Sequence, residues 1–360
     1  MKRVIAFVTS IILTVALGAC GLSSSDSQSV MGIDATGAGE VYMFKMDIPD
    51  PPDSIVGSFL YEWAAQVNEA SKGRINITIY PNSQLGAITD IIDNLKRGVS
   101  DIAWATPAMF PGRFPITEGT NLPMLDIPDH TVGTDMLNEL YSSTDFMQKE
   151  YEGIHILSLH MAAPYYFAAD EGKTIQNISD IKGMKIRAQG TYPSELLSEL
   201  GAEPVSLHAR DLYDSLSNDL IDGHLSDASV YNTWKVNEVT GHVIETPIYR
   251  FSAFLLMNPN AYNSLPDDLR AILDEQSSKE ILAYGLGQAF EEGALNGLDF
   301  YKDEGGSTST LSDADLELIK EASEKVNAKW IKDMDAAGYD GRAVFDRYSE
   351  ILAKLNKSNF

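Results

Sequence analysis

The segment Ile181–Gly190 offers the arrangement of residues in this chain best suited to hold an anion. A short basic, β-prone run ends in Arg187, and the following Thr191–Glu195 is typical of a helix start. A guanidinium is planar and can donate two parallel hydrogen bonds to one anion, and a helix N-terminus adds partial positive charge. We therefore expect Arg187 to bind a carboxylate.

The N-terminal part of the chain predicts a βαβαβ unit. Alternating or apolar runs indicate strands at residues 41–48, 75–80 and 101–105. Apolar residues at helical spacing indicate helices at residues 55–71 and 88–97 between these strands. Short connections between such elements imply a parallel sheet covered by helices.

A second α/β unit is expected around Arg187. Its elements are strands at residues 185–188, 204–207 and 221–229 and helices at residues 193–200 and 211–220. In the last of these helices, Leu212, Leu216 and Leu220 recur at helical spacing and form the expected buried face.

Long elements connect and extend the two units. We expect strands at residues 153–169 and 251–257, helices at 131–152 and from Ser312, and one long helix at 266–304. The chain is thus expected to be an α/β protein with two lobes and a cleft between them. Ligand sites in such folds lie at the carboxyl ends of strands.

The charge of the chain argues against nucleic acid as a partner. The 360 residues include 27 Lys and Arg against 52 Asp and Glu, which gives a formal net charge of −25. Phosphate backbones require a basic face. In so acidic a protein, a locally basic segment such as that around Arg187 is a stronger indication of an anion-binding site.

The N-terminal residues resemble an export signal and a tether. Residues 1–20 join a basic start to an apolar run that ends in Leu17-Gly18-Ala19-Cys20, as in a bacterial lipoprotein signal peptide. Cys20 would then carry the lipid, although an ordinary signal peptide with an incidental Cys is the alternative. Residues 21–40 read as a flexible tether, so the protein is expected outside the cytoplasm, anchored to a membrane.

An ordered set of motifs closely resembles the solute-binding receptors (DctP-like) of tripartite ATP-independent periplasmic (TRAP) transporters. The most characteristic stretch is Tyr80-Pro81-Asn82-Ser83-Gln84-Leu85-Gly86, and Ile178–Arg187 matches the central motif of the family. Other matching segments follow in the family's order, namely Leu95–Ala103, Leu200–Val205, Asp211–Tyr213, Ile221–Gly223 and Leu265-Pro266.

The resemblance implies a two-lobed periplasmic-binding-protein-like fold with a central cleft, hinge strands and a long spanning helix. Lobe I would comprise residues 41–163 and 251–265, and lobe II residues 164–250. Residues 266–360 would form the long helix and C-terminal helices that pack across both lobes. Such receptors close on a small organic acid and deliver it to membrane permease subunits. Arg187 would be the family's carboxylate clamp, exposed between the lobes in the open form.

Two departures from the family pattern affect the expected site. Tyr166 stands where many members carry a second arginine, and Ser226 takes the place of an asparagine that also touches the carboxylate. Asp227 beside it could receive an amine or a hydroxyl of the ligand. The alternative for Asp227 is a capping or solvent-facing acid.

Aromatic residues are crowded at the expected cleft positions, and about half of them should face the ligand while the others belong to the core. They are Trp104, Phe110, Tyr165, Tyr166, Phe167, Tyr231 and Trp234. Such a pocket fits a monocarboxylate with an aromatic or apolar body. Arg113 is either a second cation or a loop residue paired with Glu118, and Gln84 and Asn121 are minor polar candidates.

Enzyme chemistry finds little support in the sequence. The chain has 6 His and 1 Cys, and no zinc-binding, nucleophile-elbow or phosphate-loop motif occurs. His155 and His160 would point to opposite faces of one strand, so no metal site and no cofactor is expected. A receptor of an ABC transporter or of a sensor kinase is the alternative, and a secreted hydrolase is the remote one.

Overall fold

The computed structural model describes residues 32–33 and 39–358. The expected signal peptide, the lipid-bearing Cys20 and most of the expected tether lie outside these residues. None of the described helices combines the length and the apolar character that a membrane crossing requires.

A single ten-stranded sheet in the order β1-β2-β4-β9-β5-β8-β6-β7, with β3 beside β2 and β10 beside β9, forms the centre of the described chain. The expected strands are recovered with small shifts, except that β9 begins well before its predicted start. Their bounds are β1 Gly32–Ile33, β2 Glu40–Asp47, β3 Ile75–Tyr80, β4 Ile102–Ala105, β5 His155–Asp170, β6 Lys185–Ala188, β7 Glu203–Ser206, β8 Gly223–Ser226, β9 Thr240–Met257 and β10 Ser307–Ser309.

Lobe I is built on the parallel strands β2, β3 and β4 with helices α1 (Ile55–Ala70) and α2 (Ile91–Arg97). Helix α1 begins where expected because the Ser54 side chain accepts a hydrogen bond from the Gly57 amide at 3.0 Å. Helix α2 ends at Gly98, whose φ of 74° is the left-handed conformation that glycine adopts without strain. These local signals confirm the expected βαβαβ order.

Lobe II is built on the parallel strands β6, β7 and β8. Its helices are α6 (Thr191–Glu199), α7 (Leu212–Ser217) and α8 (Val230–Thr233). The predicted helix at 211–220 is too long, and Leu220 is 62% exposed instead of buried. Helix α7 ends at Ser217, so residue 220 lies past the helix and does not share its buried face.

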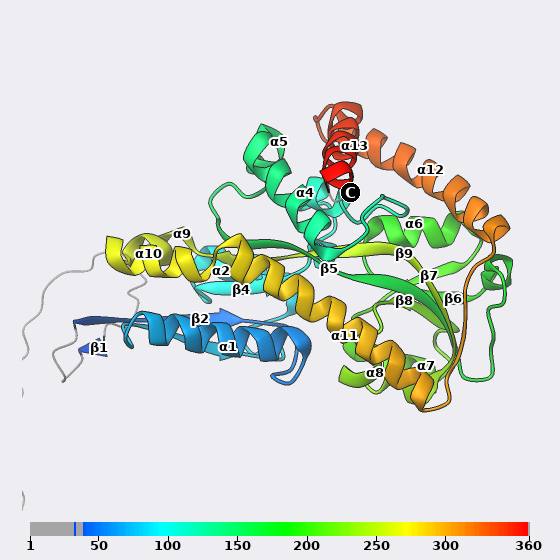
Figure 1. The fold of residues 1–360 in the computed structure, drawn as a ribbon, viewed down its shortest axis with the longest axis horizontal. Coiled ribbons are helices and arrows are strands. Elements are labelled where there is room, and N and C mark those ends of the chain that lie inside the picture. Colours follow the sequence, from blue (N-terminus) through cyan, green and yellow to red (C-terminus); the bar gives the residue numbers. More distant parts are fainter. Residues whose placement is uncertain (1–31, 34–38, 359–360) are drawn as a thin grey trace, which may run out of the picture.

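The long strands β5 and β9 pair antiparallel and cross between the lobes. Figure 1 shows both strands running across the middle of the molecule. The prediction for β9 began only at Phe251, whereas the strand begins at Thr240. Its first half includes the less buried Glu245, Thr246 and Pro247. These residues interrupt the apolar pattern, so the sequence did not indicate a strand there.

The predicted continuous helix at 266–304 is interrupted. Helix α10 (Asp267–Gln276) ends before the extended Ser278, and a π-helical turn (Lys279–Ala283) leads into α11 (Tyr284–Asp303). Helix α9 (Pro259–Ser264) precedes them. Figure 1 shows α11 running diagonally from the lobe I side of the sheet to α7 and α8 of lobe II, so the long spanning element is α11 alone.

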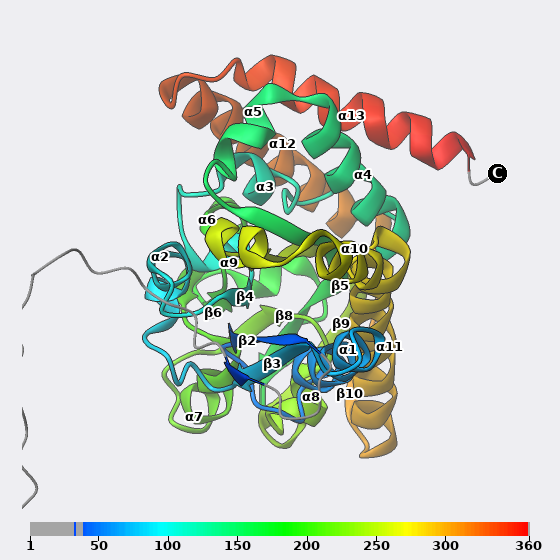
Figure 2. The same cartoon turned by 90° about the vertical axis from the view of Figure 1, so that its left-hand side faces the viewer.

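The remaining helices gather on the side of the sheet opposite α1, α7 and α8, as Figures 1 and 2 show. The predicted helix at 131–152 is two helices, because Thr144 is extended between them. Helix α12 begins as predicted, with Ser312 and Asp315 forming a reciprocal cap. The bounds are α3 Pro115–Gly119, α4 His130–Ser143, α5 Asp145–Glu150, α12 Asp313–Ala336 and α13 Gly341–Ser358.

Candidate functional site

A cavity with about 700 Å³ of empty space, open to solvent, lies between the lobes. Lobe I contributes the loop after β2 and residues around β4, and lobe II contributes the ends of β6 and β8 together with α8. The crossing strands and α11 complete the walls through Tyr165, Phe251 and Phe290. The cavity therefore lies at the carboxyl ends of strands, where ligand sites of such folds occur.

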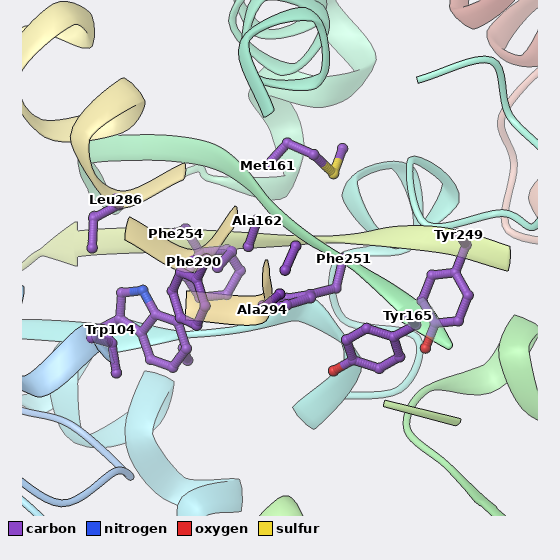
Figure 3. Close-up of a cluster of buried hydrophobic side chains, with 14 of the residues drawn as sticks. Trp104, Met161, Ala162, Tyr165, Tyr249, Phe251, Phe254, Leu286, Phe290 and Ala294 are labelled. Atoms are coloured by element: carbon purple, nitrogen blue, oxygen red, sulfur yellow. The ribbon is translucent and has the colours of Figure 1, made fainter. Parts of the chain in front are cut away.

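One wall of the cavity consists of stacked aromatic rings. Trp104 stacks on Phe290 with ring centroids 5.9 Å apart and planes 17° apart. Phe251 meets Phe290 edge-on at 5.3 Å, and Tyr165 packs against Phe251 at 5.2 Å. Figure 3 shows these rings in one continuous group. A largely apolar wall of aromatic rings suits an aromatic or aliphatic ligand body.

The Trp104 ring is held in place by a buried histidine. The indole Nε1 donates to His160 Nε2 at 3.3 Å, and Ser158 Oγ lies 3.1 Å from Nδ1 of the same ring. Burial lowers the pKa of His160 to about 3, so this histidine is neutral and can accept at Nε2. His160 therefore orients the aromatic wall from behind.

Arg187 is buried directly behind the cavity. Its side chain is 1% exposed, and the expectation that it stands open between the lobes does not hold in this conformation. Nε donates to Leu207 O at 3.0 Å, and Nη1 donates to Leu225 O at 3.1 Å and to Ser226 Oγ at 2.8 Å. Nη2 donates to Gln189 Oε1 at 3.1 Å. A buried guanidinium requires acceptors for its donors, and here neutral protein groups provide them.

Gln189 and Tyr165 separate Arg187 from the empty space. Both residues line the cavity, whereas Arg187 and Ser226 do not. Burial raises the pKa of Tyr165, and the positive charge of Arg187 acts against this rise. A carboxylate that reached Arg187 would therefore take the place of the Gln189 amide oxygen.

Two acids face the cavity from opposite lobes. Asp227 is 7% exposed and accepts hydrogen bonds from the amide of Ser229, at 3.0 Å, and from its hydroxyl. Burial raises the pKa of Asp227. Asp50 lies in the loop after β2, and burial followed by the negative charge of Asp227 raises its pKa to about 7.

The sequence reasoning missed several residues that line the cavity. They are Asp50, Met109, Gln189, His208, Arg210, Phe251 and Phe290. Asp50 could have been found, because it follows the end of a predicted strand, where ligand sites gather. Phe290 could not, because nothing in a helical sequence shows which apolar positions reach a cavity.

The other expected site residues divide into three groups. Trp104, Tyr165, Asp227 and Trp234 line the cavity. Ser226 is buried and touches Arg187, while Tyr166 pairs with Ser226 across the sheet and does not line the cavity. Burial raises the pKa of Tyr166 to about 12.

The third group lies away from the cavity lining. Phe110 packs against Phe114 at 6.2 Å, and Gln84 is exposed in a loop. Arg113 forms an ion pair of 2.8 Å with Asp93, so neither of its two expected roles is seen in this structure. Glu118 instead accepts from the Thr191 amide at 2.8 Å, at the start of α6.

Three further aromatic and polar candidates have structural roles. Phe167 is fully buried, and Tyr231 stacks on Tyr301 at 5.0 Å, so both belong to the core. Asn121 Oδ1 accepts from the Ser252 amide at 2.8 Å and thereby anchors β9. Within residues 32–33 and 39–358, the acids, histidines and cysteines form no group of three or more that could hold a metal ion.

Solved structures of other proteins share the fold of this chain. A TRAP solute-binding protein from Rhodoferax ferrireducens T118, solved with copurified benzoate, is 28% identical, with a TM-score of 0.83 and coverage of 89% of this chain and 100% of that one. A marine metagenome TRAP solute-binding protein specific for aromatic acid ligands, in complex with metahydroxyphenylacetate, is 27% identical, with a TM-score of 0.80 and coverage of 87% and 99%.

A relative with a different named ligand also matches. The C4-dicarboxylate-binding periplasmic protein DctP of Rhodobacter capsulatus is 23% identical over 261 residues, which cover 67% of this chain and 72% of that protein. Residues 48–333 match the profile of DctP, bacterial extracellular solute-binding protein family 7. The chain belongs to this family of bacterial extracellular solute-binding proteins.

Proposed function

We propose that this protein captures an organic acid with an aromatic or apolar body, binds its carboxylate through Arg187 and delivers it to the permease subunits of a TRAP transporter. The observation that carries the proposal is the burial of Arg187 and the kind of hydrogen-bond partners that it has. The guanidinium is buried, yet none of its hydrogen-bond partners among the described residues is an acid.

A buried cation without an acid in direct contact is costly, because ions in a protein interior are ordinarily paired. A ligand carboxylate would supply that contact and form the strong, charge-assisted hydrogen bonds that a guanidinium makes with two oxygens. Gln189 occupies one Nη2 donor of Arg187 and also faces the cavity. Its amide would turn aside when the ligand arrives.

The aromatic wall favours an aromatic body over a short dicarboxylate. A dicarboxylate requires a second cation. Arg113 is paired with Asp93 outside the cavity. Arg210 lines the cavity and forms an ion pair of 3.8 Å with Asp211. Asp50 and Asp227 would repel a second carboxylate. The structural relatives that bind benzoate and metahydroxyphenylacetate support this preference.

Calorimetry with benzoate and phenylacetate tests the clamp. Arg187→Ala should weaken binding by roughly 2–5 kcal/mol, as for the loss of one partner of a buried charge pair. Arg187→Lys keeps the charge but loses the planar fork, so its loss should be intermediate. Arg113→Ala, which removes an arginine outside the cavity, is the matched control. Unchanged affinity in a folded Arg187→Ala protein would reject the clamp.

The proposal also includes the place of the protein in the cell. We infer that Cys20 carries lipid and holds the receptor near its permease outside the cytoplasm, as the sequence of residues 1–40 and the extracellular family suggest. Cys20→Ala should move the mature protein from the detergent phase to the aqueous phase. Equal partitioning of both proteins into the aqueous phase would count against the anchor.

A further inference from the structure

Asp50 and Asp227 approach the same cavity from different lobes. Asp50 follows β2 of lobe I, and Asp227 follows β8 of lobe II. Each is therefore at the carboxyl end of a strand that points at the cavity. The two carboxylates are near enough for the charge of Asp227 to raise the pKa of Asp50.

Neither acid has a cationic hydrogen-bond partner in the described part of the chain. The donors to Asp227 are the amide and hydroxyl of Ser229 and its own backbone amide. Asp50 is influenced by Arg210 at a distance, without a hydrogen bond to its carboxylate. Arg210 itself has an ion pair of 3.8 Å with Asp211.

Arg187, Asp50 and Asp227 therefore lack direct ion pairs among the described residues. No acid is a hydrogen-bond partner of Arg187, and no cation is a hydrogen-bond partner of Asp50 or Asp227. The charge of Arg187 acts against the rise in the pKa of Asp227, and that of Arg210, which also lines the cavity, acts against the rise in the pKa of Asp50. A plain carboxylate ligand would satisfy Arg187 but would add a negative charge near the acids. A ligand that also carried a positive charge would satisfy both Arg187 and the two acids.

We propose that Asp50 and Asp227 together bind a protonated amine, so that the ligand is an amino-substituted organic acid with an aromatic or apolar body. An ammonium group has three N–H donors and a positive charge, so it can donate hydrogen bonds to both carboxylates at once. A hydroxyl has one donor and can bind only one of them. This inference rests on the proposed function, because it assigns the ligand carboxylate to Arg187.

Calorimetry with one ligand series provides the first test. The series contains four acids. Phenylacetate carries no further hydrogen-bond donor, mandelate carries a hydroxyl, and phenylglycine and 3-(aminomethyl)benzoate each carry an amine. At least one amine should bind ten times more tightly than phenylacetate and mandelate. Asp50→Asn and Asp227→Asn should each reduce this advantage at least threefold, whereas Asp53→Asn, at an exposed neighbour of Asp50, should not.

A second test needs no ligand. Two neighbouring carboxylates without a direct ion pair repel one another in the empty protein, so Asp50→Asn and Asp227→Asn should each raise the melting temperature at pH 8 by about 2 °C. Asp53→Asn should leave the melting temperature unchanged. A fall or no change in both variants would show that the acids are already paired within the protein and would overturn the proposal.

The two tests separate the failure of this inference from that of the proposed function. Tighter binding of mandelate than of both amines, or an amine advantage that persists in both variants, would overturn the amine site while Arg187 remained the clamp. If no acid of the series bound but the melting temperatures rose, the aromatic body of the proposed ligand would be wrong and the acid pair would stand.

Discussion

Two buried arginines show how the surroundings of one residue type distinguish structure from binding. Arg250 donates to Glu291 from Nη2 at 2.8 Å and from Nη1 at 3.2 Å, and its other donors reach the carbonyls of Ile127, Ala162 and Pro128. Arg187 is 1% exposed against 9% for Arg250, and among the described residues none of its hydrogen-bond acceptors is an acid. Arg250 is paired with an acid of the protein, whereas the proposed ligand carboxylate would be the acid that pairs with Arg187.

The Arg250–Glu291 pair makes a prediction about stability. Glu291→Gln leaves the Arg250 charge uncompensated, and the free energy of unfolding should fall by about 3 kcal/mol, near the lower end for a buried pair because Glu291 is partly exposed. Urea denaturation measures the loss. Glu292→Gln, at an exposed neighbour on the same helix, should change stability by less than about 0.5 kcal/mol.

The same pair gives a pH dependence. Burial raises the pKa of Glu291, but hydrogen bonds from His130 and Arg250 outweigh it and lower the pKa from 4.5 to about 2. A lowered pKa means that the contribution of Glu291 to stability is present above 4.5 and lost as the pH falls toward 2. The Glu291→Gln protein should lose less stability than the wild type over this interval. Parallel curves for the two proteins would contradict the pairing.

At the scale of elements, α11 contacts both lobes through glycines. A Cβ at Gly293 would lie 2.1 Å from Cδ1 of Ile55 in α1, and a Cβ at Gly297 would lie 2.0 Å from the carbonyl oxygen of Ala228 in lobe II. Helix interiors disfavour glycine, so close approach accounts for these positions. Through them α11 connects lobe I to the segment that carries Asp227.

Gly297→Ala tests this close approach. Alanine raises helix propensity by about 1 kcal/mol, yet the clash with backbone should outweigh it and give a net loss of about 1–3 kcal/mol. Gly293→Ala is the matched comparison, because it meets the end of a side chain that can rotate, and its loss should be smaller. Thermal unfolding compares the two. A gain in stability for Gly297→Ala would show that α11 does not press on lobe II.

At the scale of the whole molecule, the cavity has walls from both lobes, and β5, β9 and α11 extend across them (Figure 1). A ligand that contacts both lobes at once stabilises the arrangement in which they are close. Closure would rotate one lobe relative to the other about these connecting elements. The surface formed by closure would then differ from that of the empty receptor, which a permease could distinguish.

Small-angle X-ray scattering tests closure. A saturating organic acid should reduce the radius of gyration of the wild-type protein and of Arg113→Ala, because both retain the clamp. A concentration that just saturates the wild type should have little effect on Arg187→Ala, because the weaker binding expected of this variant leaves it mostly unliganded. A wild-type radius of gyration that stays the same although calorimetry shows saturation would mean that binding does not close the lobes.

The sequence by itself determined most of the local elements. The spacing of apolar residues and the caps at Ser54, Gly98 and Ser312 are local signals, and they set most helices and strands. The place of Arg187 in β6, shortly before α6, was predictable for the same reason, since a basic strand followed by a helix start is a local pattern. Its role as a carboxylate clamp stays a prediction.

The tertiary structure decided which residues meet. Trp104 and Phe290 are far apart in the chain and form one wall only because α11 crosses the sheet, whereas Phe110 and Tyr166 pack elsewhere. Arg113 forms an ion pair with Asp93 because the fold places that acid beside it. Asp50 and Asp227 share a cavity because two strands from different lobes end there. Contacts between distant residues depend on how the elements pack, and local sequence patterns do not contain that information.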